Sequence, residues 1–158
     1  ANLCTHADIE VIEPHPHPLA IERVKNLNNL SYKKKLEGEY DILIATDVFE
    51  HVLDPLALVA KTSLSLKKDG YFLIANCFEP VIKCHLPQYY HFSQTFNQAL
   101  EAMNFEIIEK VIYGTVFKIN KKLNIDEARK IEKKSQKLWF FTKNLHRRIA
   151  SPITKLLI

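Results

Sequence analysis

The sequence contains little glycine, since only three of its 158 residues are glycine: Gly38, Gly70 and Gly114. At the average usage of about 7%, a chain of this length would hold roughly eleven. A Walker loop or a G-x-G-x-x-G turn needs clustered glycines, because only glycine lets the backbone approach a phosphate closely. The wide spacing of these three glycines excludes both nucleotide-binding fingerprints from the printed sequence.

Cysteines and long apolar runs are also scarce. The three cysteines, Cys4, Cys77 and Cys84, are odd in number and show no C-x-x-C spacing. We therefore expect neither a disulfide framework nor a structural zinc cluster, and we infer a reducing, cytoplasmic location. No apolar run approaches the roughly 18 residues that span a bilayer, and the N-terminus lacks the pattern of a signal peptide.

The composition is that of a globular protein, with 47% apolar and 25% charged residues, but the charge is unevenly distributed. Residues 1–117 contain 10 Lys and Arg against 15 Asp and Glu, whereas residues 118–158 contain 12 against 3. We therefore expect an acidic domain at residues 1–119 and a basic helical extension at residues 120–158, with different roles.

Apolar runs and helix-spaced segments alternate along the acidic part. The run at residues 40–45 is nearly all apolar, which is typical of a strand buried on both faces. Asp54 and Pro55 open a helix as N-cap and first residue, and the basic residues and glycine of 67–70 end it. Ser93 is expected to cap a later helix that ends near Asn104. The predicted strands are residues 9–12, 30–33, 40–45, 71–75, 105–112 and 115–119, and the predicted helices are residues 19–27, 54–67 and 93–104.

This order predicts an α/β fold with a doubly wound, mostly parallel sheet, helices on both faces and a final antiparallel hairpin. In such sheets ligands bind beyond the carboxyl ends of the strands. The candidate positions are therefore Glu13, residues 47–51 and residues 76–91.

Residues 47–55 read Asp-Val-Phe-Glu-His-Val-Leu-Asp-Pro. The stretch resembles the acidic-x-x-Glu-His-x-x-Asp-Pro motif of one branch of the class I S-adenosylmethionine-dependent methyltransferases. Residues 66–74, 91–96 and 100–106 resemble the family's helix-to-strand joint and its last helix, so the likeness covers residues 9–119. The family begins with a strand and a glycine-rich turn that this chain lacks. We therefore expect a Rossmann-like fold without its first βα unit, in a chain truncated before Ala1.

The resemblance implies that S-adenosylmethionine is the cofactor and that Glu13, Pro14 and Asp47 contact it. A carboxylate at Glu13 can accept hydrogen bonds from both ribose hydroxyls, and Pro14 would lie against the adenine edge. Asp47 would face the methionine portion. The alternatives are that Glu13 caps a helix dipole and that Asp47 caps the next turn.

Glu50 and His51 are the candidate catalytic residues. Methyl transfer to a hydroxyl is assisted by a general base, and a neutral histidine suits that role. A divalent metal on Asp47, Glu50 and His51 is an alternative, as is a purely structural role, and our assignment includes no metal ligand. His85, Tyr89, Tyr90 and His91 lie in the following loop and are candidate substrate-binding residues, although docking of the loop's aromatic rings on the core is an alternative.

The basic extension has apolar residues at heptad-like spacing, namely Ile131, Leu138 and Leu145, with aromatic residues at 139–141. Packing on the domain or on a second subunit in a homo-oligomer is one explanation. Peripheral contact with an anionic membrane is another, whereas nucleic acid is not expected as a partner.

The leading hypothesis is a methyltransferase enzyme that acts on a small-molecule acceptor, at oxygen. A non-catalytic methyltransferase-like subunit that serves in binding or assembly is the alternative. The missing glycine-rich turn motivates that alternative.

Overall fold

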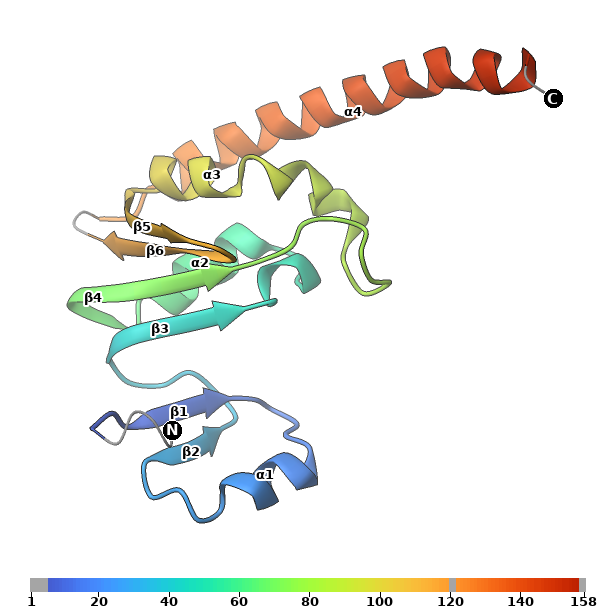
Figure 1. The fold of residues 1–158 in the computed structure, drawn as a ribbon. Coiled ribbons are helices and arrows are strands. Elements are labelled where there is room, and N and C mark those ends of the chain that lie inside the picture. Colours follow the sequence, from blue (N-terminus) through green and yellow to red (C-terminus); the bar gives the residue numbers. More distant parts are fainter. Residues whose placement is uncertain (1–5, 120–121, 157–158) are drawn as a thin grey trace. The chain divides into compact units, whose positions relative to one another are not determined.

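The computed structural model describes residues 6–119 and 122–156, with side chains up to residue 143. The chain divides into two compact units, Ala1–Gly38 and Glu39–Ile158. Gly38, at the end of the first unit, has a φ of 104°, which is strained for any residue with a side chain. Figure 1 shows the strands and helices of each unit, and they confirm the mixed α/β architecture that the sequence predicts.

The first unit is a single β-α-β element. Strands β1 (Ile9–Ile12) and β2 (Leu30–Lys33) pair in parallel, and helix α1 (Pro18–Val24) connects them. The helix begins where expected, because Pro18 fits its first turn and the His17 side chain accepts a hydrogen bond from the Leu19 N–H. Both strands have the predicted bounds, whereas the helix ends three residues before the predicted residue 27.

The second unit contains a four-stranded sheet in the order β3-β4-β6-β5. Strands β3 and β4 are parallel, whereas β6 is antiparallel to both β4 and β5. The predicted hairpin is confirmed, since Val111 pairs with Gly114 across the turn. The strand bounds are β3 Tyr40–Thr46, β4 Leu66–Ala75, β5 Phe105–Val111 and β6 Gly114–Ile119.

One hydrophobic core fills the second unit. Phe72 and Ile74, at alternate positions of β4, are buried in it together with Phe117 of β6. The helices α2 (Pro55–Ser63), α3 (Phe96–Ala102) and α4 (Ile125–Leu156) add residues such as Leu56, Leu100 and Ala128 to the same core. Because side chains alternate along a strand, all three helices cover the face of the sheet to which Phe72 and Ile74 point.

The prediction that residues 40–45 are buried on both faces is wrong. Leu43 and Ala45 pack against the core, but Ile42 and Ile44 on the opposite face are 57% and 66% exposed. A nearly all-apolar strand is typical of burial on both faces, but the helices of the second unit cover only one face of β3.

Helix α2 ends earlier than the sequence predicts, at Ser63, and residues 67–70 belong to β4 instead. The reason is pairing with β3: the Tyr40 N–H donates to the Ser65 carbonyl, and Leu66 pairs with Tyr40. The Lys67 ammonium also bonds the Asp41 carboxylate on β3 and thereby lowers the pKa of Asp41. Sheet pairing therefore overrides the local helical pattern.

The segment before α3 also differs from the prediction. Residues 87–93 form a 3-10 helix, η2 (Pro87–Ser93), where a loop was expected. Ser93 ends this helix and is not a cap, since the N-cap of α3 is Thr95. The Thr95 hydroxyl donates to the His91 carbonyl and so ties the two helices together.

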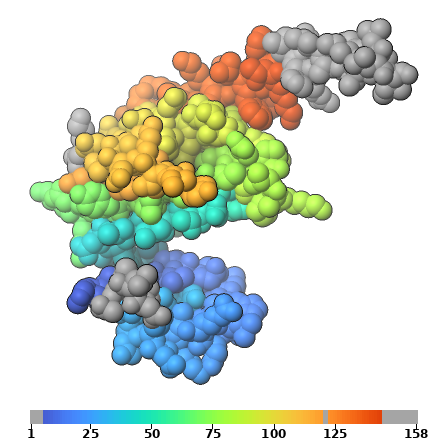
Figure 2. Space-filling model, viewed as in Figure 1, coloured from blue at the N-terminus to red at the C-terminus, as the bar shows by residue number. Residues whose placement is uncertain are grey.

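Helix α4 packs on the rest of the second unit through its first turns. In Figures 1 and 2 this part of α4 lies beside α3. Of the three apolar residues at heptad-like spacing, Ile131 packs against the core, which agrees with packing on the domain, whereas Leu138 is 62% exposed. The Leu145 side chain lies outside the described residues. Among the helices of the described part of the chain, none is long and apolar enough to cross a membrane.

Candidate functional site

The parallel strands β3 and β4 end at the same edge of the sheet, and the candidate residues of the second unit follow them. The Asp47 N–H donates to the Ala75 carbonyl at 2.8 Å, so the two strand ends are joined. Asn76 Oδ1 accepts hydrogen bonds from the N–H groups of Val48 and Phe49, at 3.4 and 3.2 Å. These bonds fix the short 3-10 helix η1 (Phe49–His51) against the chain that leaves β4.

Asp47 is the residue at which the chain turns. Its φ of 53° lies in the left-handed region, which aspartate tolerates better than most residues. The side chain is exposed, and it forms no hydrogen bond or ion pair with any residue that the structure describes. The turn therefore leaves a free carboxylate at the carboxyl end of β3.

Glu50, in η1 three residues after Asp47, is only 1% exposed. Its Oε1 accepts a hydrogen bond of 2.8 Å from the Cys77 N–H. Its Oε2 is buried and has no hydrogen-bond partner within the described ranges. A carboxylate in this position is expensive to bury, because only one of its oxygens is compensated.

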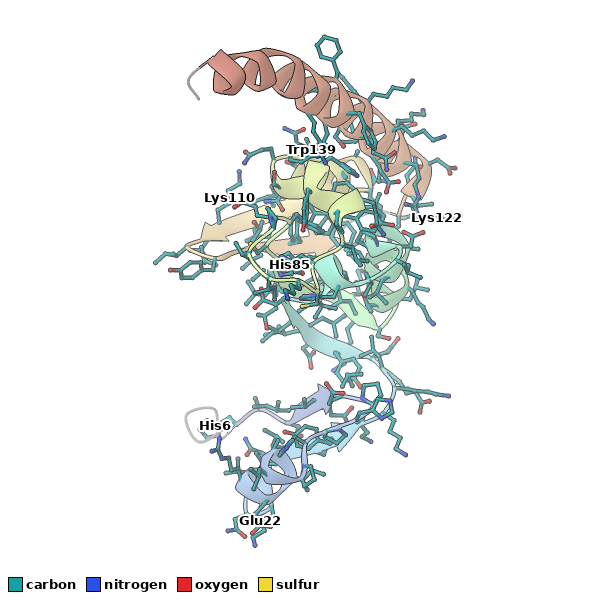
Figure 3. The ribbon with its side chains drawn as sticks, turned by 90° about the vertical axis from the view of Figure 1, so that its right-hand side faces the viewer. His6, Glu22, His85, Lys110, Lys122 and Trp139 are labelled. Carbon is teal, nitrogen blue, oxygen red and sulfur yellow. The ribbon has the colours of Figure 1, made fainter. Side chains whose placement is uncertain are left out.

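Two histidine rings meet beside Glu50. His51 and His85 have ring centroids 4.8 Å apart in an edge-to-face arrangement. The Nδ1 of His51 lies 3.2 Å from the Cys84 carbonyl oxygen, and the Nδ1 of His85 lies 2.6 Å from that of Glu79. His85, labelled in Figure 3, is 4% exposed and comes from the loop between β4 and η2. Each of Glu50, His51 and His85 offers one ligand atom, and these atoms lie within 4.8 Å of one another.

The other loop residues face elsewhere. The Tyr89 hydroxyl donates to the Leu53 carbonyl, and burial, followed by the Asp54 charge, raises the pKa of this tyrosine. The Tyr90 hydroxyl donates to the His85 carbonyl at 3.4 Å. His91 is buried against α4, where its Nδ1 lies 2.7 Å from the Ser135 hydroxyl, and burial lowers its pKa to about 4. Of the four loop residues, only His85 joins Glu50 and His51.

Asp54, near the end of the motif at residues 47–55, bonds both α2 and α4. Asp54 caps α2 by accepting a hydrogen bond of 2.9 Å from the Ala57 N–H, as the sequence predicts. Its second oxygen forms an ion pair of 2.5 Å with Arg129. The sequence gives no sign of this partner, because 75 residues separate the two and no spacing rule reaches that far.

A groove of about 730 Å³ lies at the end of β4, and Glu50, His51 and His85 are not among its lining residues. It is connected to these residues through its lining, since the Cys77 N–H donates to Glu50 and the Glu79 carbonyl bonds His85. Its walls come from the chain after β4, from α3 and from the β5–β6 hairpin. The polar residues that line it include Asn76, Asn97, Gln98, Lys110 and Tyr113. Asn76 falls within the candidate range of residues 76–91, whereas the other four were not predicted, because they belong to no short motif.

Glu13 and Pro14 belong to the first unit. Glu13 follows β1 directly; its N–H donates to the Lys33 carbonyl, and its Oε1 accepts a bond of 2.9 Å from the His15 N–H. Both residues are exposed. The Glu13 carboxylate therefore stands at a strand end with its other oxygen open to solvent.

This arrangement defines an α/β protein whose candidate ligand-binding residues follow the carboxyl ends of parallel strands. A family model described as "Methyltransferase domain" matches residues 2–110, more than two thirds of the chain. The chain thus belongs to this family of class I S-adenosylmethionine-dependent methyltransferases. The matched range contains every site residue predicted from the sequence. Comparison with curated proteins finds no match.

Proposed function

We propose that the protein transfers a methyl group from S-adenosylmethionine to a hydroxyl group of a small molecule. The observation that carries this proposal is the pair Glu50 and His51, held at the carboxyl end of β3 in a methyltransferase domain, with Glu50 bonded to Cys77 of a polar groove. The groove has the size of a small-molecule site.

Two exposed carboxylates suit the cofactor. Glu13 is exposed and can accept from ribose hydroxyls, with Pro14 next to it. Asp47 is exposed and bonds none of the residues that the structure describes, so it can accept from an ammonium group. S-adenosylmethionine, when bound, supplies an electrophilic methyl group on a sulfonium.

On the acceptor side, His51 is proposed to take up the proton that the acceptor hydroxyl loses. The bond to the Cys84 carbonyl fixes the Nδ1 proton, so Nε2 remains the basic nitrogen. His85 and Tyr90 are proposed to border the acceptor. Tyr89 and His91 hold the segment in place through Leu53 and Ser135.

Cofactor binding tests the first half of the proposal. We expect the full-length protein to bind S-adenosylhomocysteine in a calorimetric titration. Glu13→Gln should weaken binding about tenfold, because it replaces a charged acceptor by a neutral one. Glu22→Gln, an exposed change on α1, is the matched control. An absence of binding by the unaltered protein would contradict the proposal and favour the non-catalytic subunit.

Methyl transfer tests the second half. With an acceptor found by screening hydroxylated small molecules with labelled cofactor, His51→Gln should lower the rate of methyl transfer about 10²–10⁴-fold, because the proposed base is lost. A set of acceptors methylated only at nitrogen or carbon would contradict the assignment to oxygen.

We further propose that α4 binds the surface of anionic membranes. Leu138, Phe140 and Phe141 are 62%, 59% and 66% exposed, in a segment rich in lysine. Apolar residues next to basic ones are the pattern of an interfacial helix.

A further inference from the structure

Helix α4 contacts both parts of the chain that supply the candidate catalytic residues, although it lies outside the matched range of residues 2–110. These parts are the motif segment (residues 47–55) and the loop segment (residues 84–93), which contains His85. The helix packs on α2, on α3 and on η2. Its polar contacts come from three side chains that are three residues apart and so lie at neighbouring positions of the helix surface, namely Arg129, Glu132 and Ser135.

The first contact is an ion pair between α4 and the motif segment. Arg129 Nη2 lies 2.5 Å from Asp54 Oδ2, and Arg129 Nη1 lies 2.8 Å from Glu132 Oε2. The Arg129 and Glu132 side chains are only 28% and 13% exposed. A planar guanidinium presents its donors in fixed directions, so two carboxylates on different elements hold it in one orientation. Asp54, three residues after His51, is thereby fixed to α4.

The second contact joins α4 to the loop segment. His91 Nδ1 lies 2.7 Å from the Ser135 hydroxyl, and both residues are buried. The hydroxyl donates its one proton to the Glu132 carbonyl at 3.0 Å, so it accepts from His91, whose Nδ1 carries a proton. Since His91 follows His85 by six residues, this bond fixes the end of the loop segment to α4.

The motif segment and the loop segment also bond each other directly. The Tyr89 hydroxyl donates to the Leu53 carbonyl. The Leu86 N–H donates to the Glu50 carbonyl at 3.0 Å. The two segments are therefore joined at two points directly and at two further points through α4.

We propose that Arg129 and Ser135 are positioning residues, which hold His51 and His85 in the arrangement that methyl transfer requires. The two histidines come from different segments, and their ring centroids are 4.8 Å apart. A shift of either segment by about 1 Å would misdirect a catalytic side chain, and such a shift can cost about 10²-fold in rate. The catalytic consequence rests on the proposed function, whereas the arrangement of the two rings can be measured without it.

Nuclear magnetic resonance of the full-length protein tests the positioning directly. We expect Arg129→Gln and Ser135→Ala each to shift the ring-nitrogen resonances of both His51 and His85, because each variant removes one attachment to α4. Lys130→Gln is the matched control, since it removes a neighbouring cation and an exposed ion pair within α4. It should leave both resonances in place.

Amide hydrogen exchange separates positioning from a general loss of stability. In Arg129→Gln and Ser135→Ala we expect amides of the motif segment and the loop segment to exchange about fivefold faster than in the unaltered protein. Amides of β4 and β6 should exchange at their former rates, because the sheet keeps its contacts. A purely structural role predicts an equal increase in β4 and β6.

Methyl transfer provides the third measurement. Arg129→Gln should lower kcat about tenfold, because His51 is displaced, and should leave the affinity for S-adenosylhomocysteine unchanged. Arg129 pairs with Asp54 and Glu132 and not with the proposed cofactor residues. Arg129→Lys should recover part of kcat, since it keeps the charge but not the planar arrangement of donors.

The positioning role is contradicted if the resonances of His51 and His85 are the same in Arg129→Gln, in Ser135→Ala and in the unaltered protein. It is also contradicted if exchange rises equally in β4 and β6, or if Arg129→Gln has the kcat of Lys130→Gln. An absence of S-adenosylhomocysteine binding by the unaltered protein contradicts the proposed function instead. The resonances and the exchange rates do not involve the methyl donor, so they decide the positioning role in that case too.

Discussion

At the scale of single residues, burial decides what the histidines of the motif region do. His51 and His85 share a cluster with a buried carboxylate, whereas His91, only six residues after His85, is enclosed against α4. All three have the same side chain in the same region of the sequence. Their different surroundings give them different roles, which no local pattern distinguishes.

The titration of His91 should be visible in protein stability. Burial lowers its pKa in the folded state to about 4, below the ordinary value of 6.5, so the unfolded chain binds more protons between these values. The stability of the folded state that depends on neutral His91 is therefore fully present above pH 6.5 and is lost as the pH falls toward 4. We expect His91 to make the free energy of unfolding about 2 kcal/mol lower at pH 5 than at pH 7.5, measured by urea denaturation.

In the variant His91→Gln this part of the pH dependence should disappear, whereas in the exposed control His17→Gln it should remain. An identical pH dependence in His91→Gln and the unaltered protein would show that His91 is not the titrating group.

Asp54 combines two roles that a pair of substitutions can separate. It caps α2 and forms an ion pair with Arg129 of α4. Asparagine caps as well as aspartate but carries no charge, so Asp54→Asn should lower the free energy of unfolding by at most about 1 kcal/mol, the worth of a partly exposed ion pair. Asp54→Ala should cost about 1 kcal/mol more, because it also removes the cap. Equal losses in thermal unfolding would mean that the cap contributes nothing.

At the scale of elements, pairing between strands determined the boundaries that local sequence left ambiguous. Residues 67–70 look like a helix end, with basic residues followed by glycine, yet they extend β4. Gly70 lies so close to β3 that an added Cβ would be 2.9 Å from the Asp41 carbonyl oxygen. The glycine therefore serves a close approach of two strands and not the end of a helix.

Helix α4 should bind anionic vesicles if its exposed apolar residues contact lipid. We expect the protein to sediment with phosphatidylcholine–phosphatidylglycerol vesicles at low salt and to be released as salt rises, because salt screens the attraction. Phe140→Ser with Phe141→Ser should reduce the bound fraction severalfold. Val81→Ser with Ile82→Ser changes an exposed apolar pair elsewhere in the second unit and is the matched control. An absence of sedimentation at low salt ends the membrane proposal.

At the scale of the whole molecule, the two units differ in how much they bury. All residues of the hydrophobic core lie in the second unit, and none of the described residues of the first unit is buried. A unit of this length without a core is expected to be marginally stable.

Amide hydrogen exchange should reveal this difference. We expect amides of β1 and β2 to exchange at least tenfold faster than those of β4 and β6, because local opening of the first unit exposes little apolar surface. Similar protection in both units, measured by exchange and mass spectrometry, would contradict this expectation.

The sequence by itself determined the periodic and capped elements. Strands β1 and β2, the start of α2 at Asp54 and Pro55, and the β5–β6 hairpin all follow from neighbouring residues. The motif at residues 47–55 also indicated the family, because its characteristic residues are adjacent in the sequence. These features depend on interactions within a few residues, which a sequence displays directly.

Only the tertiary structure decided the rest. It paired His85 with His51 and Glu50, turned His91 toward Ser135, joined Asp54 to Arg129 and left Ile42 and Ile44 exposed. Each of these outcomes depends on which distant segments meet, and such meetings are set by how the helices and strands share one core. The scarcity of glycine excluded two kinds of phosphate-binding loop, but the packing of η1 against the loop after β4 created the candidate site.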